Sequence, residues 1–478
     1  MYKIQYILPF LLYSLTGRAQ SEQQLFWLLN GSANGFVWDA TTGNNRIDNS
    51  NGTWNNTNTN KTWTFNKGIT DVAWRSGAAA IFGGNPGTGT AGTVTVSGTQ
   101  TVQSLTFNPA ASGTFTLSGG TITNNSGNIT ANAGASIGSM LAGSAGLTLS
   151  GSGTIILTGP ATYTGTTTLN SGTLQLSNGI PNSTSPTLST PVVIASGATL
   201  AADILTANVN LSGNISGAGT LAIAATGTQA QTMRLYGTNS SFTGNFSEPS
   251  TTRGMMWSDN GGTGNAANTG SAAATWNLSG SFGMIETAGS ATPVVQLGSL
   301  SGTNTATSLG AFSGSGIKTF QIGALNTNTS FSGAIQDNPQ ATGTSTTALI
   351  KVGSGTLTIS GNCTYSGTTT VTTGTLALTG AFPTSTSWNI GVNATSTPSL
   401  SNSGKLTLAN APPLLSAITI NIQLTGTSTG FTWQAVSWTG TSLALPTLQI
   451  NGTTVISGVA NGGTTVTYTA GSGVTVTR

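Results

Sequence analysis

The chain has 478 residues, of which only 4 % are Asp, Glu, Lys or Arg, and its formal net charge is +3. An average soluble domain carries about 25 % charged residues, whereas here Gly supplies 67 residues and Ser, Thr and Asn fill most polar positions. An apolar content of 36 % excludes a disordered chain. The absence of histidine excludes Ser-His-Asp, Cys-His and His-metal sites, and singly scattered basic residues exclude a nucleic-acid patch.

Residues 1–19 predict a signal peptide. Lys3 precedes an apolar core from Ile4 to Leu15, and Gly17 and Ala19 are the small residues that signal peptidase prefers. This core is too short to span a bilayer as an ordinary helix, so we expect cleavage after Ala19 and no transmembrane segment in the mature chain. Cleavage removes two basic residues and leaves a net charge of +1. An extracellular or cell-surface location follows.

Residues 20–90 are rich in tryptophan and contain five of the ten Trp residues of the chain. We expect this segment to be an N-terminal cap, because the terminal units of a stacked repeat are atypical and protect its edge. The alternative is an aromatic platform for sugar rings. The candidate glycan-contact residues are Trp38, Trp54, Trp63, Trp433 and Trp438.

From Gly92 the chain consists of short alternating runs such as TVTVSG, VQSLTFNP and GTFTLSGG, separated by Gly, Asn or Pro. This pattern predicts short strands and tight turns, with no helical period. Even spacing of short strands is also compatible with a sandwich or a barrel. An internal repeat favours stacking instead, and we predict an all-β solenoid over residues 91–410.

The repeat occurs at 152–177, SGTIILTGPATYTGTTTLNSGTLQLS, and at 354–379, SGTLTISGNCTYSGTTTVTTGTLALT. The two copies align without a gap, and about half of their positions are identical. With roughly 20 to 25 residues per coil, each copy is one coil or slightly more. The repeat-defining residues are Gly153, Tyr163, Gly165, Gly172, Leu174 and Leu176, and Gly355, Tyr365, Gly367, Gly374, Leu376 and Leu378.

Leucines two residues apart in GTLQL and GTLAL point to the same side of a strand, so we predict that Leu174 and Leu376 are buried. Gly165 and Gly172 stand where the chain turns a corner, and we expect positive φ there. The single cysteine, Cys363, replaces Ala161 of the first copy, which predicts a small inward or turn residue and no internal disulfide.

Degenerate relatives of the repeat occur in the middle of the chain, at Leu235–Ser247 and Ala324–Asn338, with Phe in place of Tyr. The interval Met255–Ala274 is rich in Gly, Asn and Ala and predicts a loop-rich excursion. After Pro412 and Pro413, residues 411–478 predict a β meander that forms a C-terminal cap.

The two full copies resemble the autotransporter-associated β-strand repeat, also called the passenger-associated-transport repeat, with a pattern close to GxGTLTLSGxNTYTGxTTVxxGTLxL. Gly355–Leu378 matches nearly throughout, and Gly153–Leu176 departs at Pro160 and Ala161. The resemblance implies a right-handed parallel β-helix displayed outside a bacterial cell. The chain ends in GSGVTVTR, from which we expect no C-terminal translocator barrel and a separate export route.

Parallel β-helices include polysaccharide-degrading enzymes, whose sites need clustered carboxylates. The acidic residues of this chain lie far apart in sequence, so we expect no enzyme, cofactor or metal. Two hypotheses stay open: a structural or adhesin-like surface protein, and a carbohydrate-binding protein that uses exposed Trp residues. Partners would be extracellular polysaccharide or cell-surface components, and a polysaccharide-degrading enzyme is the remote alternative.

Overall fold

The structure is a computed structural model. It describes residues 35–41, 47–64, 70–84, 89–177, 186–204, 207–224, 231–249, 254–258, 270–286, 292–339, 342–380, 387–393, 403–408, 418–425, 432–438, 446–458, 460–461, 464–469 and 473–477. None of these residues is helical. Among them, accordingly, no helix has the length and apolar character needed to cross a membrane. The predicted signal peptide, residues 1–19, lies outside the described residues.

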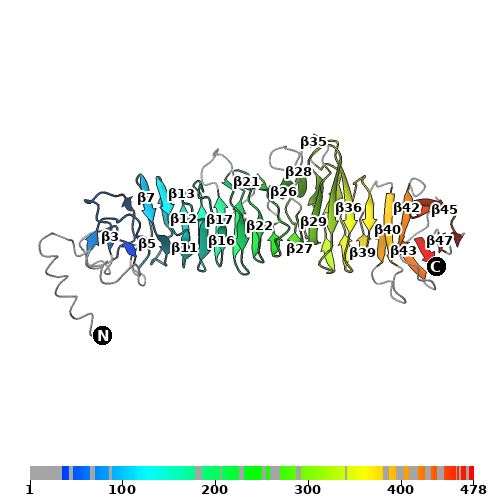
Figure 1. Cartoon of the computed structure of the whole chain (residues 1–478), viewed down its shortest axis with the longest axis horizontal. Coiled ribbons are helices and arrows are strands. Elements are labelled where there is room, and N and C mark those ends of the chain that lie inside the picture. Colours follow the sequence, from blue (N-terminus) through cyan, green and yellow to red (C-terminus); the bar gives the residue numbers. More distant parts are fainter. Residues whose placement is uncertain are drawn as a thin grey trace, which may run out of the picture. The chain divides into compact units, whose positions relative to one another are not determined.

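The chain folds into two compact units, residues 1–165 and 166–478. In both, strands stack one coil upon the next, as the successive arrows in Figure 1 show. The strands of the first unit are β1 (Phe36–Trp38), β2 (Gly52–Trp54), β3 (Trp63–Thr64), β4 (Asp71–Val72), β5 (Ala79–Phe82), β6 (Thr93–Val96), β7 (Thr99–Val102), β8 (Ser104–Phe107), β9 (Phe115–Ser118), β10 (Thr121–Asn124), β11 (Asn128–Ala131), β12 (Ala135–Ile137), β13 (Met140–Ala142), β14 (Leu147–Ser150) and β15 (Thr154–Leu157).

Three parallel sheets form the walls of the first unit. They have the strand orders β5-β8-β11-β14, β7-β10-β13 and β2-β6-β9-β12-β15. Thr130 and Ser150 face each other from successive coils, 20 residues apart, and Asn108 and Asn132 lie 24 residues apart. The coil size therefore agrees with the 20 to 25 residues assumed from the repeat.

The second unit continues the same construction with more strands. They are β16 (Thr167–Leu169), β17 (Thr173–Ser177), β18 (Thr187–Leu188), β19 (Val192–Ile194), β20 (Thr199–Asp203), β21 (Val209–Leu211), β22 (Ile215–Ser216), β23 (Thr220–Ile223), β24 (Met233–Leu235), β25 (Asn245–Ser247), β26 (Gly254–Ser258), β27 (Gly270–Asn277), β28 (Phe282–Glu286), β29 (Val294–Ser301), β30 (Ser308–Ala311), β31 (Ser313–Gly314), β32 (Ile317–Ile322), β33 (Thr329–Phe331), β34 (Ala334–Gln336), β35 (Thr342–Gly343), β36 (Thr346–Lys351), β37 (Thr356–Ile359), β38 (Thr369–Val371), β39 (Gly374–Leu378), β40 (Ser387–Asn393), β41 (Gly404–Leu408), β42 (Thr419–Thr425), β43 (Thr432–Ser437), β44 (Thr447–Ile450), β45 (Thr453–Val455), β46 (Ala460–Asn461), β47 (Thr464–Thr469) and β48 (Gly473–Thr477).

The longest ladder of the second unit runs in parallel from β17 through β20, β23, β25, β27, β29, β32, β36, β38, β40 and β42 to β44. A second parallel wall has the order β18-β21-β24-β26-β28-β30-β34. A third follows β33-β37-β39-β41-β43. The all-β parallel helix predicted from the repeat is confirmed by these pairings.

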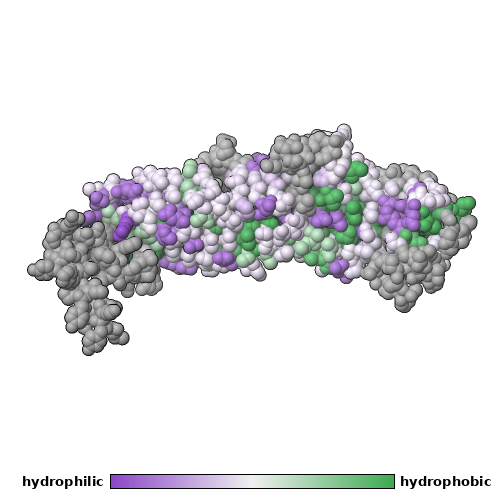
Figure 2. All heavy atoms as spheres, in the orientation of Figure 1, coloured by the Kyte–Doolittle hydropathy of each residue, from purple (hydrophilic) through white to green (hydrophobic). Residues whose placement is uncertain are grey.

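Alternation along each strand builds the core. In β6 the two valines are buried and the two threonines exposed, and β37 and β39 alternate in the same way. Because parallel register places each inward side chain over its equivalent in the next coil, the apolar residues form continuous columns. The outer surface is mostly hydroxyl and amide, and the face seen in Figure 2 is correspondingly pale over much of its area.

The two ends of the predicted loop-rich excursion are strands: residues 255–258 belong to β26 and residues 270–274 to β27, whereas residues 259–269 lie outside the described residues. All five residues of β26 are buried, and β27 pairs with both β25 and β29.

The parallel ladder also extends beyond the boundaries at residues 90 and 411. β5 and β2 already pair in parallel with β8 and β6, and β42 and β44 continue the ladder after β40. Antiparallel pairs occur at β1–β3 and β3–β4, and at β44–β45, β43–β48, β46–β47 and β47–β48. Pro412 and Pro413 therefore do not end the ladder, because each of its strands pairs with a strand one full coil away.

Candidate functional site

The inward leucines of the repeat lie where the sequence predicts them. Leu174 and Leu376 are fully buried, and Leu176 and Leu378 nearly so. Leu174 stands in register with Leu200 of the next coil. Leucines two apart therefore contribute to the apolar column and present no chemistry to the solvent.

The glycines of the repeat serve two different purposes. Gly172 and Gly374 have φ of +73° and +66°, as expected at a corner. The positive φ expected at Gly165 is wrong, since this glycine is not among those with positive φ. It serves close packing, because a Cβ there would come within 2.5 Å of the Gly146 amide nitrogen. In the same way, a Cβ at Gly367 would overlap the Thr347 carbonyl. Gly153 and Gly355 also pack directly against the backbone of the preceding coil.

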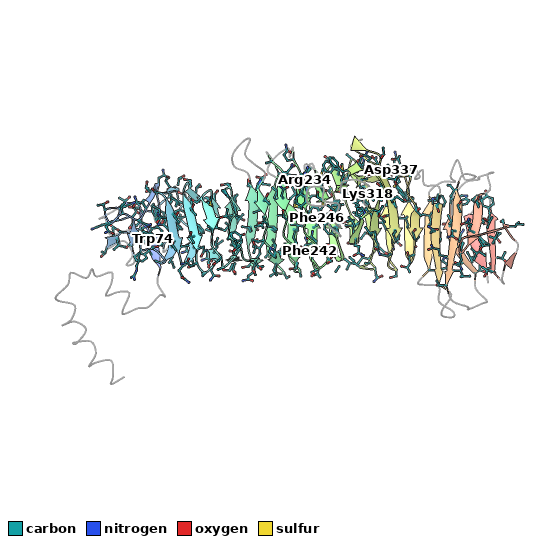
Figure 3. All side chains as sticks on the ribbon, turned by 45° about the horizontal axis from the view of Figure 1, so that its top comes forward. Trp74, Arg234, Phe242, Phe246, Lys318 and Asp337 are labelled. Atoms are coloured by element: carbon teal, nitrogen blue, oxygen red, sulfur yellow. The ribbon has the colours of Figure 1, made fainter. Side chains whose placement is uncertain are left out.

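The aromatic residue of the repeat fills the corner of the coil. Tyr163 and Tyr365 are buried, and the Tyr365 hydroxyl lies 2.7 Å from the Thr369 hydroxyl. Burial raises the pKa of Tyr365, so its phenol stays protonated. Phe242 and Phe331 of the degenerate copies are also fully buried, and Phe242 is marked in Figure 3. The corner position therefore requires a ring rather than a hydroxyl.

Cys363 lies inside the same corner. Its side chain is fully buried and its thiol is 3.8 Å from the Gly361 carbonyl oxygen. Burial raises the pKa of the thiol to about 11, so the reactive thiolate is not formed near neutral pH.

Four of the five tryptophans proposed as glycan contacts are buried. Trp38, Trp54 and Trp63 are fully buried, and Trp438 is 4 % exposed. Trp433 is half-buried, and its indole N–H donates a hydrogen bond to the Gly404 carbonyl at 2.9 Å. Because a sugar must cover an open ring face, burial removes the support that these rings gave to the glycan hypothesis.

The buried N-terminal tryptophans form one cluster with Trp74 and Phe82. Trp54 and Trp74 are T-shaped with centroids 4.9 Å apart, and Trp38 and Trp63 are T-shaped at 5.3 Å. Trp74 is marked in Figure 3. Edge-to-face contacts place the positive rim of one ring on the negative face of another, which stabilises the cluster beyond area burial. We refer to these five side chains as the tryptophan cluster.

Buried ionisable groups are the feature that sequence reasoning missed. Lys318 and Lys351 are buried on the inward side of β32 and β36. The Lys351 ammonium donates hydrogen bonds to the carbonyls of Val352 and Gly353 at 2.6 and 2.7 Å. Burial lowers the pKa of Lys351 to about 8. The sequence could have indicated this burial. In IKTFQI and TTALIK each lysine stands two residues from an inward residue, Phe320 or Leu349, and so points to the same side of the strand.

The carboxylates bind backbone amides of neighbouring coils. Asp337, marked in Figure 3, accepts hydrogen bonds from the amides of Thr347 at 2.6 Å and Ser366 at 2.9 Å, and so links its own coil to the next one. Asp203 accepts a hydrogen bond from the Ser177 hydroxyl at 2.9 Å. These carboxylates act as structural acceptors.

Glu248 lies at a buried polar corner. Its Oε1 accepts the Gly280 amide at 2.7 Å, while the Thr307 hydroxyl donates to the Gly280 carbonyl at 2.6 Å. The Asn304 amide donates to the Ser279 carbonyl at 2.8 Å. Burial raises the pKa of Glu248 to about 8. In the N-terminal region, burial likewise raises the pKa of Asp39 to about 6.

Within the described ranges, no three His, Cys, Asp or Glu side chains are grouped so that they could hold a metal ion. Each acid discussed above contacts backbone or a hydroxyl. The stacked repeats therefore form a rigid wall. The groups that this wall presents to solvent are mainly hydroxyls and amides.

Comparison with known proteins adds two findings. A family model described as passenger-associated-transport-repeat matches residues 147–176 and 349–378. The chain is also similar to a protein named adhesin BmaC autotransporter, from Brucella suis biovar 1 (strain 1330), with 30 % identity over 222 residues. This alignment covers 40 % of the present chain and 6 % of the adhesin, so the chain spans a small part of that relative. No solved structure matches the chain.

The two matched ranges are the coils with inward leucines, buried corner tyrosines and tightly packed glycines. Together with the parallel ladders, the similarities support a surface protein with a β-helical body. The chain carries two copies of the passenger-associated-transport repeat, at residues 147–176 and 349–378.

Proposed function

We propose that the chain is a non-catalytic, exported bacterial surface protein whose β-helix has an adhesin-like or scaffolding role. The observation that carries the proposal is the incorporation of both passenger-associated-transport repeats into continuous parallel ladders. A relative named as an autotransporter adhesin adds support. Export through the leader at residues 1–19, and caps at residues 20–90 and 411–478, belong to the same proposal.

The mode of action follows from the surface. Outward positions carry mainly Thr, Ser and Asn, and charged residues make up 4 % of the chain. A single exposed hydroxyl contributes little, since it exchanges a water hydrogen bond for another hydrogen bond. Many such groups held in fixed register can act together, because after the first contact the others bind at high effective concentration. The β-helix thus provides adhesion by repetition.

An enzymatic role has less support. Glycoside hydrolysis requires two carboxyl groups on either side of one bond. Asp337 and Glu248 instead bind backbone amides within the wall. Carbohydrate binding through aromatic rings also has less support, because of the five proposed rings only Trp433 is not buried.

The proposal is tested in the source bacterium with a strain that lacks the gene and a strain complemented with the full chain. Antibody labelling of intact cells should detect the protein at the surface, and attachment to solid supports should fall in the deletion strain and recover on complementation. Detection only inside the cell, or unchanged attachment, would contradict the proposal. Release of reducing sugars from polysaccharide by the purified chain would contradict its non-catalytic part.

A further inference from the structure

Three of the nine acidic residues of the chain lie near one another beside the antiparallel sheet β1–β3–β4 of the first unit. Asp39 directly follows β1, and Asp71 is the first residue of β4. Asp48 lies next to Asp39, because the Ala40 amide donates a hydrogen bond to the Asp48 carbonyl at 2.9 Å. The negative charges of Asp48 and Asp71 both act on Asp39. In a chain with only 4 % charged residues, this group is an unusual concentration of like charge.

Strand pairing places these carboxylates on the side of the sheet that faces away from the tryptophan cluster. Trp38 and Trp63 stand opposite each other in the β1–β3 pair, and both point into the core. Because successive side chains alternate, Asp39 and Thr62, the next opposite pair, point to the other side. Asp71 shares that side, since it stands one residue before the partner of Trp63.

Buried oxygen atoms on this side lack a hydrogen-bond partner among the described residues. The Asp39 side chain is 0 % exposed, and its Oδ1 accepts a hydrogen bond from the Asp48 amide at 3.1 Å, whereas its Oδ2 accepts none. The hydroxyl oxygen of Thr62, directly across the strand pair, is also buried without a partner. We call Asp39, Asp48, Thr62 and Asp71 the acidic corner.

The charge of Asp39 needs compensation at neutral pH. Burial and the negative charges of Asp71 and Asp48 raise the pKa of Asp39 to about 6. A proton therefore satisfies Oδ2 only in acidic solution, and near neutral pH the buried carboxylate is mainly ionised. A buried charge is costly unless it is paired or bound to a cation.

The donor atoms favour calcium among the common cations. Ca²⁺ binds carboxylate and other oxygen ligands in irregular geometry, whereas Mg²⁺ demands a near-ideal octahedron and Zn²⁺ takes mainly nitrogen and sulfur. No three acidic side chains of the described residues meet at one point. A cation here would thus contact Asp39 directly, while Asp48 and Asp71 add charge at longer range. Calcium sites of extracellular modules bind with dissociation constants of about 10⁻⁴ to 10⁻³ M, and we expect an affinity in this range.

We propose that the acidic corner binds a calcium ion through Asp39 Oδ2 and the Thr62 hydroxyl, with the charges of Asp48 and Asp71 in support. The inference goes beyond the surface role proposed above. It departs from the expectation of no metal, which rested on the separation of the acidic residues in the sequence. Calcium would stabilise the β1–β3–β4 sheet, at which the ladder through β5 and β8 ends.

The test titrates calcium chloride into the purified full chain, first freed of bound ions with EDTA, in a calorimeter. Tb³⁺, which replaces Ca²⁺ in oxygen-rich sites, gives a second readout. Its luminescence is excited by energy transfer from a nearby indole, and Trp38 and Trp63 adjoin the acidic corner in sequence. Melting temperatures with calcium chloride and with EDTA give a third readout, because a ligand that binds the folded state stabilises it.

Two variants and one control locate the site. Asp39→Asn removes the charge and keeps an oxygen acceptor for the Asp48 amide. Thr62→Val removes only the hydroxyl and keeps the β-branched shape. The matched control is Asp203→Asn, which neutralises a buried acid of the second unit that binds the Ser177 hydroxyl.

We expect the wild-type chain and Asp203→Asn to bind calcium equally, to excite terbium luminescence and to melt at a higher temperature with calcium than with EDTA. Asp39→Asn should lose all three effects, and Thr62→Val should bind more weakly. A wild-type chain that does not bind calcium, or equal binding by Asp39→Asn, would overturn the inference. If Asp39→Asn does not fold, an unchanged dissociation constant of Thr62→Val would overturn it. Equal stabilisation by sodium chloride at the same ionic strength would assign the effect to screening and overturn it too.

Discussion

At the residue scale, the leucines and glycines of the repeat differ in the space that the fold leaves for a side chain, and both kinds of position occur within a few residues of each other. Leu376 needs space inside the coil, where it stands in register with Leu357 and Leu406. At Gly367 there is no space for a side chain, because the backbone at Thr347 occupies the position where a Cβ would lie. The stability of the wall should therefore respond strongly to changes of volume in either direction.

Shortening the inward leucine tests the first kind of position. We expect Leu376→Ala to reduce the free energy of unfolding by about 2 to 5 kcal/mol, through lost burial and the cavity left behind. The control Thr375→Ala alters a half-buried side chain on the opposite face and should change stability by about 0.5 kcal/mol or less. Urea unfolding followed by circular dichroism measures both. Equal effects of the two substitutions would refute the inward column.

Adding a methyl group tests the second kind of position. We expect Gly367→Ala to destabilise the protein by about 1 to 3 kcal/mol, because the new Cβ would overlap the Thr347 carbonyl. Gly134→Ala is the control, since a Cβ there finds its nearest neighbour, the Thr154 carbonyl oxygen, at an ordinary 3.6 Å. Thermal melting compares the two. A tolerated Gly367→Ala would show that close packing is not the reason for this glycine.

Glu248 should make stability depend on pH. Burial raises its folded-state pKa from the ordinary value of 4.5 to about 8, so its contribution to stability is complete below the unfolded pKa and is lost as pH rises through about 8. We expect the melting temperature to fall between about pH 5 and about pH 9, with a loss of a few kcal/mol. Glu248→Gln, which keeps an oxygen acceptor for the Gly280 amide, should flatten this dependence. An identical pH profile in the variant would exclude Glu248 as its origin.

At the scale of elements, strands could be predicted where apolar and polar residues alternate along the sequence. They could not be predicted where the strand exists only because it pairs with a strand of a neighbouring coil. The alternating runs from Gly92 and the inward leucines of the repeat follow from side-chain parity alone. The parts of β26 and β27 that lie within residues 255–274 were expected to be loop, because Gly and Ala in sequence do not reveal that each strand pairs with strands of the neighbouring coils. The continuation through β42 and β44 was hidden for the same reason, since each strand pairs with one a full coil away.

The tryptophan cluster illustrates the same limit. Sequence gives the enrichment of Trp in residues 20–90 but not whether the rings face inward or outward, because a cap and a sugar platform need the same side chains. Burial of Trp54 and Trp63 decides in favour of packing.

Truncation of a clustered ring should therefore act on stability. We expect Trp63→Ala to cost about 3 to 5 kcal/mol and to remove aromatic signal from the near-ultraviolet circular dichroism spectrum. Trp433→Ala, at a half-buried ring, should cost less. Chemical unfolding with both spectral regions recorded measures the difference. Glycan binding that Trp63→Ala abolishes in a fully stable protein would revive the sugar platform.

At the scale of the whole molecule, the scarcity of charge distinguishes this protein from surfaces that attract partners electrostatically. Twelve basic and nine acidic residues are spread over 478 positions, and several of them, such as Lys351 and Glu248, are buried. Long-range steering therefore contributes little to encounter. Contact must depend on short-range hydrogen bonds and apolar groups arranged by the coil.

The scarcity of exposed charge predicts that attachment is insensitive to salt concentration. We expect cells that display the chain to adhere equally at low and high sodium chloride concentration, because hydroxyl and amide contacts are not screened as charge pairs are. Adhesion counts corrected for the deletion strain measure the effect. Introducing lysines at outward positions, as in Thr95→Lys combined with Thr99→Lys, should create salt dependence toward anionic supports. Strong salt dependence of the unmodified chain would mean that its few exposed charges, rather than the ordered hydroxyl surface, drive attachment.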